Sequence, residues 1–269
     1  MRKVVSNRYR ESGLSDFETF EDAAARQERM LRQFDRNGIE HDLDACSPTD
    51  CSYPPCVEAC HFVSVHRRVA ALETGLPLLQ RHPGPHYQVC IVHPLWEADE
   101  GELSTIGMVA AKQWLYRRLW QLKRHVWAIG IFEASLNIEL NKNRYWAGEL
   151  QLICCGLERD ELKKALKIEN RYREMRPRQR MLQISDVGNL ERQFMYAQKR
   201  FVERRVAYIC KNGRQHRRHL PLSDANQVEF DSWLNDLPSG GRNVCFGISR
   251  RGHTFFAPDA TLQGGADEI

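Results

Sequence analysis

The stretch WAIGIFEASLNIELNKNRYWAGELQLICCG, residues 127–156, decides the fold, because it contains two strand-like runs joined by a short polar link. Residues 127–137 and 147–156 are apolar and of strand length. Side chains alternate between the two faces of a strand, so Glu149 and Gln151 point to the same side. Any functional interpretation has to explain these two oxygen-bearing side chains on an apolar strand.

The segments on either side of this strand pair complete a βαββαβ pattern. A strand and a helix are predicted before it, and a helix and a strand after it, at residues 87–96, 104–125, 158–168 and 180–187. Two split βαβ units in this order predict a ferredoxin-like α+β core, an antiparallel sheet with its helices on one face. A long basic helix, 189–212, and a strand, 243–252, are expected after the core.

Composition divides the 269 residues into four parts. We expect a helical N-terminal appendage (1–45), a Cys-rich module with a helix (46–83), the core (84–218) and a tail with one strand (219–269). No stretch approaches the roughly 20 apolar residues of a membrane span, and no apolar segment follows the basic N-terminus. We therefore expect a cytoplasmic protein without a membrane partner.

Positive charge is concentrated in one region. Between Lys112 and Arg218 there are 25 Lys and Arg against 11 Asp and Glu, although the whole chain has a net charge of only +4. Such concentration is typical of a phosphate-binding surface, and a solvated helical face is the alternative.

Glu133, on the strand before Glu149 and Gln151, adds a third oxygen donor. Carboxylate and amide oxygens are ligands that Mg²⁺ and Mn²⁺ prefer, so these three residues predict a divalent metal site. The alternative is that they are ordinary polar residues on a half-exposed sheet face.

Tyr208 and Lys211 form a Tyr-x-x-Lys pattern at the end of the predicted helix 189–212. A tyrosine can attack a phosphodiester and an ammonium group can stabilise the phosphate charge. The alternative is that the tyrosine is an aromatic residue at the end of a helix, packed on the core, and that the lysine is simply solvated.

Together these motifs resemble the HUH endonucleases, the replication initiators of rolling-circle plasmids and small circular single-stranded DNA viruses, with relatives among transposases. IGIFEASLN resembles the acidic-ligand strand of the plasmid initiators, YWAGELQLICCG their Trp-x-Pro-His-hydrophobic-His strand, and AYICKNG their tyrosine motif. The resemblance covers about residues 87–212. It implies nicking of single-stranded DNA or a DNA hairpin by Tyr208, assisted by Lys211 and a metal ion.

The sequence departs from the family at its metal-binding histidines, which are replaced here by Glu149 and Gln151. The resemblance therefore implies an altered, oxygen-only metal site and impaired nicking. DNA binding does not need the metal, because backbone contacts need only cationic side chains. The leading phosphate contacts are predicted to be Arg204, Arg205, Arg214, Arg217 and Arg218.

Four cysteines lie within fifteen residues: Cys46, Cys51, Cys56 and Cys60. Without a signal peptide such clusters favour metal ligands over disulfides, and zinc is the ion expected, with an iron–sulfur cluster or unligated thiols as alternatives. A non-catalytic zinc-containing DNA-binding or adaptor protein is accordingly the second hypothesis for function. An RNA-binding protein is the third, since ferredoxin-like sheets bind single strands.

Overall fold

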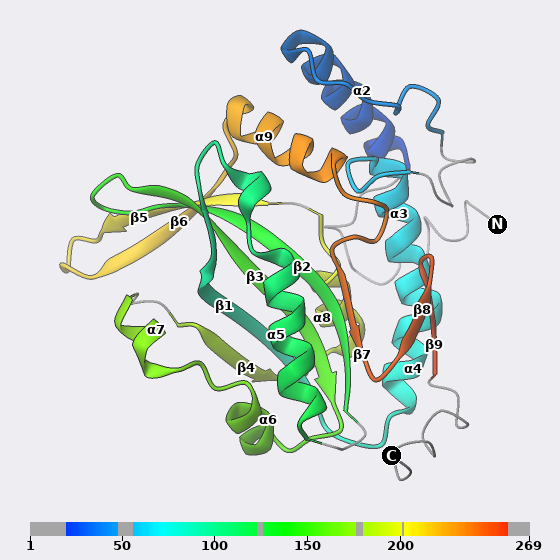
Figure 1. The fold of residues 1–269 in the computed structure, drawn as a ribbon, viewed down its shortest axis with the longest axis vertical. Helices are drawn as coiled ribbons and strands as arrows, with labels where there is room; N and C mark the ends of the chain where they lie inside the picture. Colours follow the sequence, from blue (N-terminus) through cyan, green and yellow to red (C-terminus); the bar gives the residue numbers. More distant parts are fainter. Residues whose placement is uncertain (1–19, 48–55, 123–125, 176–179, 201, 258–269) are drawn as a thin grey trace.

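In the computed structural model, residues 20–47, 56–122, 126–175, 180–200 and 202–257 are described, and they form a mixed α+β fold around one large sheet (Figure 1). The helices are α2 (Phe20–Asn37), α3 (His61–Ala70), η1 (Ala71–Gly75), α4 (Leu76–Arg81), η2 (Leu103–Thr105), α5 (Met108–Trp120), α6 (Arg159–Ala165), α7 (Asn170–Met175), α8 (Leu190–Tyr196) and α9 (Asp224–Asn235). The strands are β1 (His86–Asp99), β2 (Trp127–Ile138), β3 (Arg144–Cys155), β4 (Leu182–Asp186), β5 (Glu203–Ile209), β6 (Gln215–Pro221), β7 (Asn243–Phe246), β8 (Ser249–Arg251) and β9 (Thr254–Phe256). The predicted α+β class is confirmed. Among these residues no helix combines the length and apolarity that crossing a membrane requires.

The main sheet has seven strands in the order β4-β1-β3-β2-β5-β6, and β7 pairs with β2 outside this path. The pairs β4–β1, β1–β3 and β3–β2 are antiparallel, whereas β2 and β5 are parallel. Strand β3 therefore lies between the two long strands β1 and β2. It comes close to β2 because Gly130 lacks a Cβ, which would otherwise lie 1.9 Å from the carbonyl oxygen of Gln151.

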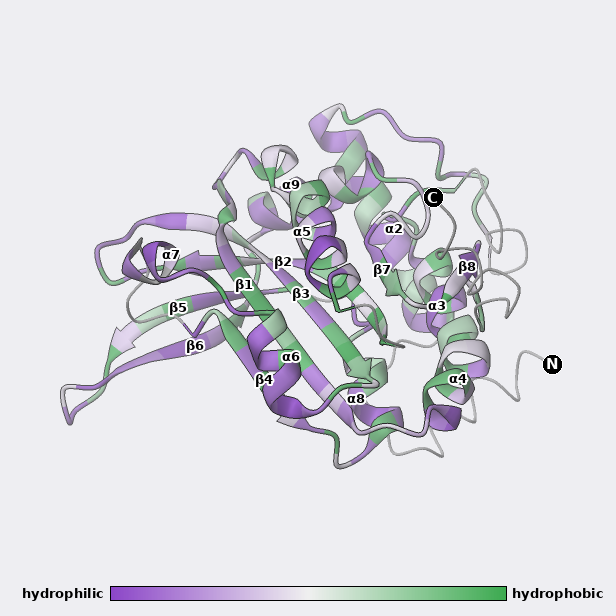
Figure 2. Ribbon diagram, turned by 60° about the horizontal axis from the view of Figure 1, so that its bottom comes forward, coloured by the Kyte–Doolittle hydropathy of each residue, from purple (hydrophilic) through white to green (hydrophobic). Residues whose placement is uncertain are grey.

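Helices cover both faces of the central strands, as Figure 1 shows for α5 in front and α8 behind. On the α5 side, Leu115 and Leu119 pack with the β3 residues Leu150 and Leu152. On the opposite side, Phe194 of α8 packs with residues of β2, β3, η1 and α4 in a second cluster. Apolar stretches run along β1 and β3 in Figure 2, and both strands contribute buried residues to the core on the α5 side. Burial on both faces explains why the central strands read as nearly continuous apolar runs.

The sheet is larger than the four-stranded antiparallel sheet predicted from the sequence. Strands β5 and β6 extend it beyond β2, and the β2–β5 pair introduces a parallel step. This step joins Leu136 to Arg204 and Ile138 to Val206. Pairing between residues so distant along the chain leaves no periodic signal in the sequence.

The predicted helix 189–212 is wrong beyond its first third, because α8 ends at Tyr196 and residues 203–209 form β5. Strand β5 pairs with β6 from Glu203 opposite Pro221 to Ile209 opposite Gln215. The hairpin turns at Asn212-Gly213, where Gly213 has a φ of 75°. Asn-Gly between strands is a strong hairpin signal, and ladder pairing overrides the helical propensity of Glu and Arg.

Both ends of the described chain contribute to the main core. Phe34 of α2 and Trp233 of α9 belong to the same buried cluster as Trp146 of β3. Strand β7, from the segment expected as a tail, pairs with β2 from Asn243 opposite Ile131 to Phe246 opposite Ala128. The predicted strand 243–252 is interrupted, since β7 ends at Phe246 and β8 begins at Ser249.

Candidate functional site

The structure brings the three predicted metal ligands together on the sheet face opposite α5. Glu149 and Gln151 share this face of β3, and Glu133 of β2 lies directly opposite Glu149 in the strand register. All three are buried, with 1% of Glu149, 3% of Glu133 and 5% of Gln151 exposed. Two adjacent carboxyl groups therefore lie within the sheet, where each needs a partner.

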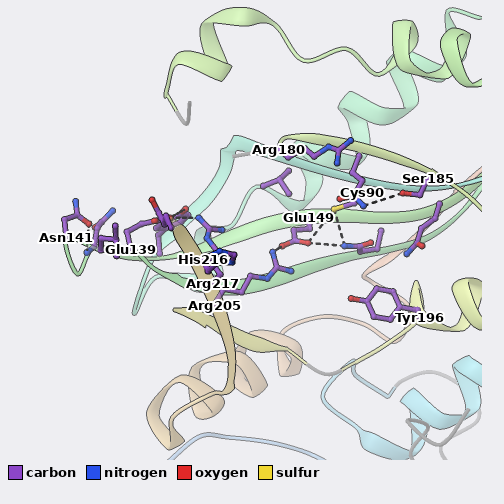
Figure 3. A pocket seen from close by; sticks show the side chains of 18 residues that line it. Cys90, Glu139, Asn141, Glu149, Arg180, Ser185, Tyr196, Arg205, His216 and Arg217 are labelled. Carbon is purple, nitrogen blue, oxygen red and sulfur yellow. Dashed lines mark hydrogen bonds and ion pairs between the residues drawn. The ribbon is translucent and has the colours of Figure 1, made fainter. Parts of the chain in front are cut away.

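Both carboxylate oxygens of Glu149 have partners. Ser135 donates to Oε1 at 2.8 Å, and the Arg205 guanidinium of β5 forms an ion pair with the same oxygen. Gln151 donates through Nε2 to Oε2 at 3.1 Å, and the Cys90 thiol lies 3.8 Å from that oxygen. Figure 3 shows Glu149 between Cys90 and Arg205.

Glu133 has a different cation. The Nζ atom of Lys199 lies 3.4 Å from Oε2 of Glu133 and donates a hydrogen bond to the Tyr196 hydroxyl at 2.9 Å. The same ammonium group lies 4.2 Å from the centre of the Tyr196 ring. The other carboxylate oxygen of Glu133 is buried and has no hydrogen-bond partner among the described residues. Lys199 therefore links a buried carboxyl group to an exposed tyrosine.

The two carboxyl groups are shifted in opposite directions. Burial, together with the negative charge of the neighbouring Glu149, raises the pKa of Glu133 to about 7 against the attraction of Lys199. Burial also acts to raise the pKa of Glu149, but the charge and hydrogen bond of Arg205 outweigh it, so the net shift is downward. Opposed shifts of this kind are how a paired site separates a proton-carrying group from an ionised one.

Glu149 and Gln151 line a cavity of about 890 Å³, the sheet pocket, whereas Glu133 and Lys199 are not among its described lining residues. Its lining comes from β1, the β2–β3 turn, β3, β4, α8, β5 and β6, and its cationic side chains are Arg180, Arg205, Arg217 and, when protonated, His216. Arg217 donates to Asn137 at 2.9 Å and to Glu139 at 2.7 Å. Tyr196 also lines the pocket, with its hydroxyl pointing toward the centre (Figure 3).

The arrangement does not fit the divalent metal ion that the HUH resemblance implies. A Mg²⁺ or Mn²⁺ ion needs oxygen atoms that are free to coordinate it. Here Arg205 contacts one carboxylate and Lys199 the other, and Gln151 directs its amide nitrogen to Glu149. An ion at this place would have to displace a cation that already balances the buried charge, so these residues do not form a site for a divalent metal ion.

The predicted nucleophile lies elsewhere. Tyr208 is in β5, three residues from Arg205, so alternation directs the two side chains to opposite sides of the strand. Its exposed ring lies 6.1 Å from the His216 ring and 5.5 Å from the Arg218 guanidinium carbon. Lys211 is exposed in the β5–β6 turn. Neither Tyr208 nor Lys211 lines the sheet pocket.

The predicted phosphate contacts divide into two groups. Arg205 and Arg217 line the sheet pocket. Arg214 and Arg218 are exposed on the β5–β6 hairpin, and Arg204 is half-buried on β5.

Sequence reasoning missed Tyr196 and Lys199. Their spacing is the same Tyr-x-x-Lys pattern that singled out Tyr208, so the signal was in the sequence. The expectation of one helix through 189–212 placed the tyrosine motif at that helix's end. Because α8 ends at Tyr196, the Tyr-x-x-Lys pattern that lies at a helix end is the one formed by Tyr196 and Lys199.

The cysteine cluster is compact. The sulfur atoms of Cys46, Cys56 and Cys60 all lie within 4.8 Å of one another, and those of Cys46 and Cys56 are 3.6 Å apart. Three thiols at this spacing could hold a metal ion. Cys51, the fourth predicted ligand, lies outside the described residues.

The loop between Cys56 and Cys60 carries a buried charge network. Glu58, 2% exposed, accepts from Arg67 and, at 3.2 Å, from Arg242. Burial acts to raise the pKa of Glu58, but the charges of Arg67 and Arg242 lower it to about 2. The Glu58 carbonyl accepts from Arg200 at 3.0 Å, and Arg200 also forms an ion pair with Asp231 of α9 at 3.2 Å. The cysteine loop is therefore tied to the residue that follows Lys199.

Comparison with known family models, curated proteins and solved structures finds no match for this chain, so the functional argument rests on its own residues.

Proposed function

We propose that the protein binds single-stranded DNA in the sheet pocket and that Tyr196 is the residue that can nick it, in an HUH-like reaction without a divalent ion. One observation carries the proposal: the Tyr196 hydroxyl, hydrogen-bonded to the Lys199 ammonium, lines the same cavity as Glu149, Gln151 and Arg205. A nucleophile, a cation beside it and a cationic pocket are the parts that attack on a phosphodiester requires.

We also propose that the central strands form a ferredoxin-like core. The four strands β4-β1-β3-β2 are antiparallel at every step, which supports a split βαβ core of the ferredoxin-like type, enlarged by β5, β6 and β7. In this core the Glu149 strand is an inner strand. The tyrosine-bearing helix α8 follows the fourth strand and contacts β1 and β3.

In the proposed reaction the Tyr196 oxygen attacks phosphorus, forming a Tyr–phosphate bond. The bond from phosphorus to the 3′-oxygen breaks, and this oxygen takes a proton from water, leaving a 5′-phosphotyrosine and a 3′-hydroxyl. Lys199 donates to the Tyr196 oxygen and stabilises the negative charge that develops there, its ion pair with Glu133 holds the ammonium group in place, and the tyrosine proton passes to water. Arg205, with 22% of its side chain exposed, stabilises the phosphate charge.

A second candidate function is DNA or RNA binding without catalysis. The observation that favours it is the engagement of Arg205 and Lys199 with Glu149 and Glu133, which lowers the charge left for a reacting phosphate. For the cysteine cluster we propose zinc, which takes thiolate ligands in structural sites. The three described thiols supply three of the usual four ligands, and Cys51 is the fourth candidate from the sequence.

The test is covalent trapping on labelled single-stranded DNA of mixed sequence, read on a denaturing gel. Two variants form a matched pair, because Tyr196→Phe and Tyr208→Phe each remove one hydroxyl group. We expect an adduct with the wild type and Tyr208→Phe and none with Tyr196→Phe. An adduct that depends on Tyr208 instead would overturn the choice of nucleophile. Salt-sensitive binding without an adduct in any of the three proteins would leave the non-catalytic candidate as the function.

A further inference from the structure

A second hollow, the basic groove, lies between α6 and the edge strand β4. It has a volume of about 480 Å³ and Leu182 and Ile184 at its base. Five of its lining residues are basic, and among the described lining residues Asp160 is the single acidic one. The basic residues are Arg159, Lys163, Lys164, Lys167 and Arg180.

The short helix α6 presents its lysines outward for a local reason. Glu158 and Glu161 form a capping box at its start, and Leu162 and Leu166 are buried against the core. Helical spacing then leaves Lys163 and Lys164 exposed, and Lys167, two residues beyond the end of α6, is exposed as well.

The lysines of the basic groove repel one another electrostatically. Lys163 lies on α6 and Lys167 lies two residues beyond its end, so three lysine charges of the same sign stand within five residues of the chain and repel one another. Arg159 is held in place by an ion pair with Asp186 at 3.2 Å and a hydrogen bond to the Ile184 carbonyl at 2.7 Å. A bound polyanion would offset the remaining repulsion among the lysines.

Arg180 joins the two hollows, because it lines both the sheet pocket and the basic groove. It lies at the beginning of the β4 segment, and β4 is the last strand at this edge of the sheet. Figure 2 places α6 alongside β4, and Figure 3 shows Arg180 on the wall of the sheet pocket. Cationic side chains thus continue from Arg205 and Arg217 across the sheet edge to α6.

We propose that the basic groove binds the phosphate backbone of the DNA strand that continues out of the sheet pocket over the β4 edge. This rests on the proposed function, which assigns the pocket to a single strand. We expect the groove to recognise charge and not sequence, because the lining residues that the structure describes are lysine, arginine, one aspartate and two aliphatic residues, with no aromatic ring among them for a base to stack on.

The test compares Lys163→Ala/Lys167→Ala with Arg29→Ala/Arg36→Ala, a control that removes two exposed cations from α2. Binding is measured by fluorescence anisotropy with oligonucleotides of about 6 and about 20 nucleotides, because single-strand site sizes of about 4–16 nucleotides let the short strand fill one site and the long strand extend beyond it. The groove variant should weaken binding of the long strand roughly tenfold and lower its salt slope by about 0.7 for each phosphate that the protein no longer neutralises. The short strand, held in the sheet pocket, and the α2 control should be unaffected.

If the groove variant bound the long strand with the same affinity and the same salt slope as the wild type, the inference would be overturned and the proposed function would stay intact. If the wild type bound neither length, the proposed function itself would fail. Tighter binding of RNA than of DNA, with the same dependence on Lys163 and Lys167, would overturn the assignment of the strand as DNA.

Discussion

Replacing Glu133 by Gln should change how stability depends on pH. The pKa of Glu133 is about 7 because burial outweighs the attraction of Lys199, whereas the ordinary value is 4.5. The difference between 7 and 4.5, at about 1.36 kcal/mol per pH unit, corresponds to roughly 3 kcal/mol. A raised carboxyl pKa contributes stability that is fully present below pH 4.5 and is lost as the pH rises through 7, since the unfolded chain then releases a proton that the folded chain holds.

The measurement is urea unfolding followed by tryptophan fluorescence at several pH values from about 4.5 to 8. Because Gln cannot titrate, the free energy of unfolding of the wild type relative to Glu133→Gln should fall by about 3 kcal/mol across this range. Glu73→Gln, which removes an exposed carboxyl group from η1, controls for a lost surface charge. If the difference in the free energy of unfolding between the wild type and Glu133→Gln stayed constant with pH, the reasoning would be refuted. A difference that grows with pH would mean that Lys199 stabilises the ionised form more than burial opposes it.

Three further predictions concern the same network and the cysteine loop. Arg205→Met leaves the buried Glu149 charge uncompensated and should lower the free energy of unfolding by about 3–5 kcal/mol, and adding Glu149→Gln should restore much of it in a double-mutant cycle by urea unfolding. Withdrawing Mg²⁺ and Mn²⁺ from the buffer should leave DNA affinity unchanged in anisotropy titrations, because protein cations occupy the carboxylates; a large loss would contradict the metal-free site. Cys56→Ser should reduce the zinc content measured by elemental mass spectrometry and lower the melting temperature, whereas Cys245→Ser, outside the cluster, should retain zinc.

The central strand pair could be predicted because its signal is local. Apolar runs of strand length mark 127–137 and 147–156, and the structure forms β2 at Trp127–Ile138 and β3 at Arg144–Cys155. Alternation along β3 then correctly puts Glu149 and Gln151 on one face. The neighbouring position of Glu133 follows once the two strands pair as a hairpin, and the structure places it directly opposite Glu149.

The partners of these residues could not be predicted, because they depend on long-range pairing. Arg205 reaches Glu149 across 56 positions in the chain, through the parallel pairing of β5 with β2. Glu203, Arg204 and Arg205 do not show the alternation of apolar and polar residues that indicates a strand. The sequence pattern therefore predicts that this segment is part of a helix. That error placed the predicted tyrosine motif at Tyr208, whereas the nucleophile that we propose is Tyr196, and it hid the hairpin that Asn212-Gly213 signals.

The buried charge of Glu149, a residue that aligns with a histidine only through the resemblance to HUH endonucleases, explains the arginine beside it. A neutral imidazole can be buried in a sheet with a metal ion, but a buried carboxylate adds a negative charge that needs a cation at all times. Arg205 supplies that cation permanently. A DNA phosphate entering the sheet pocket would therefore compete with Glu149 for one guanidinium group, and Arg205, being partly exposed, is placed to contact both.

The two features singled out from the sequence, the polar strand and the cysteine cluster, belong to one connected structure. Lys199 contacts Glu133 and Tyr196, while the next residue, Arg200, donates to the Glu58 carbonyl in the loop between Cys56 and Cys60. Successive residues of one short segment thus hold the site on one side and the cysteine loop on the other. Since a metal ion bound by the thiols would fix that loop, it would also fix the backbone from which Lys199 reaches the tyrosine. A metal-loaded cluster would therefore affect the sheet pocket through this shared segment, without contacting a bound strand itself.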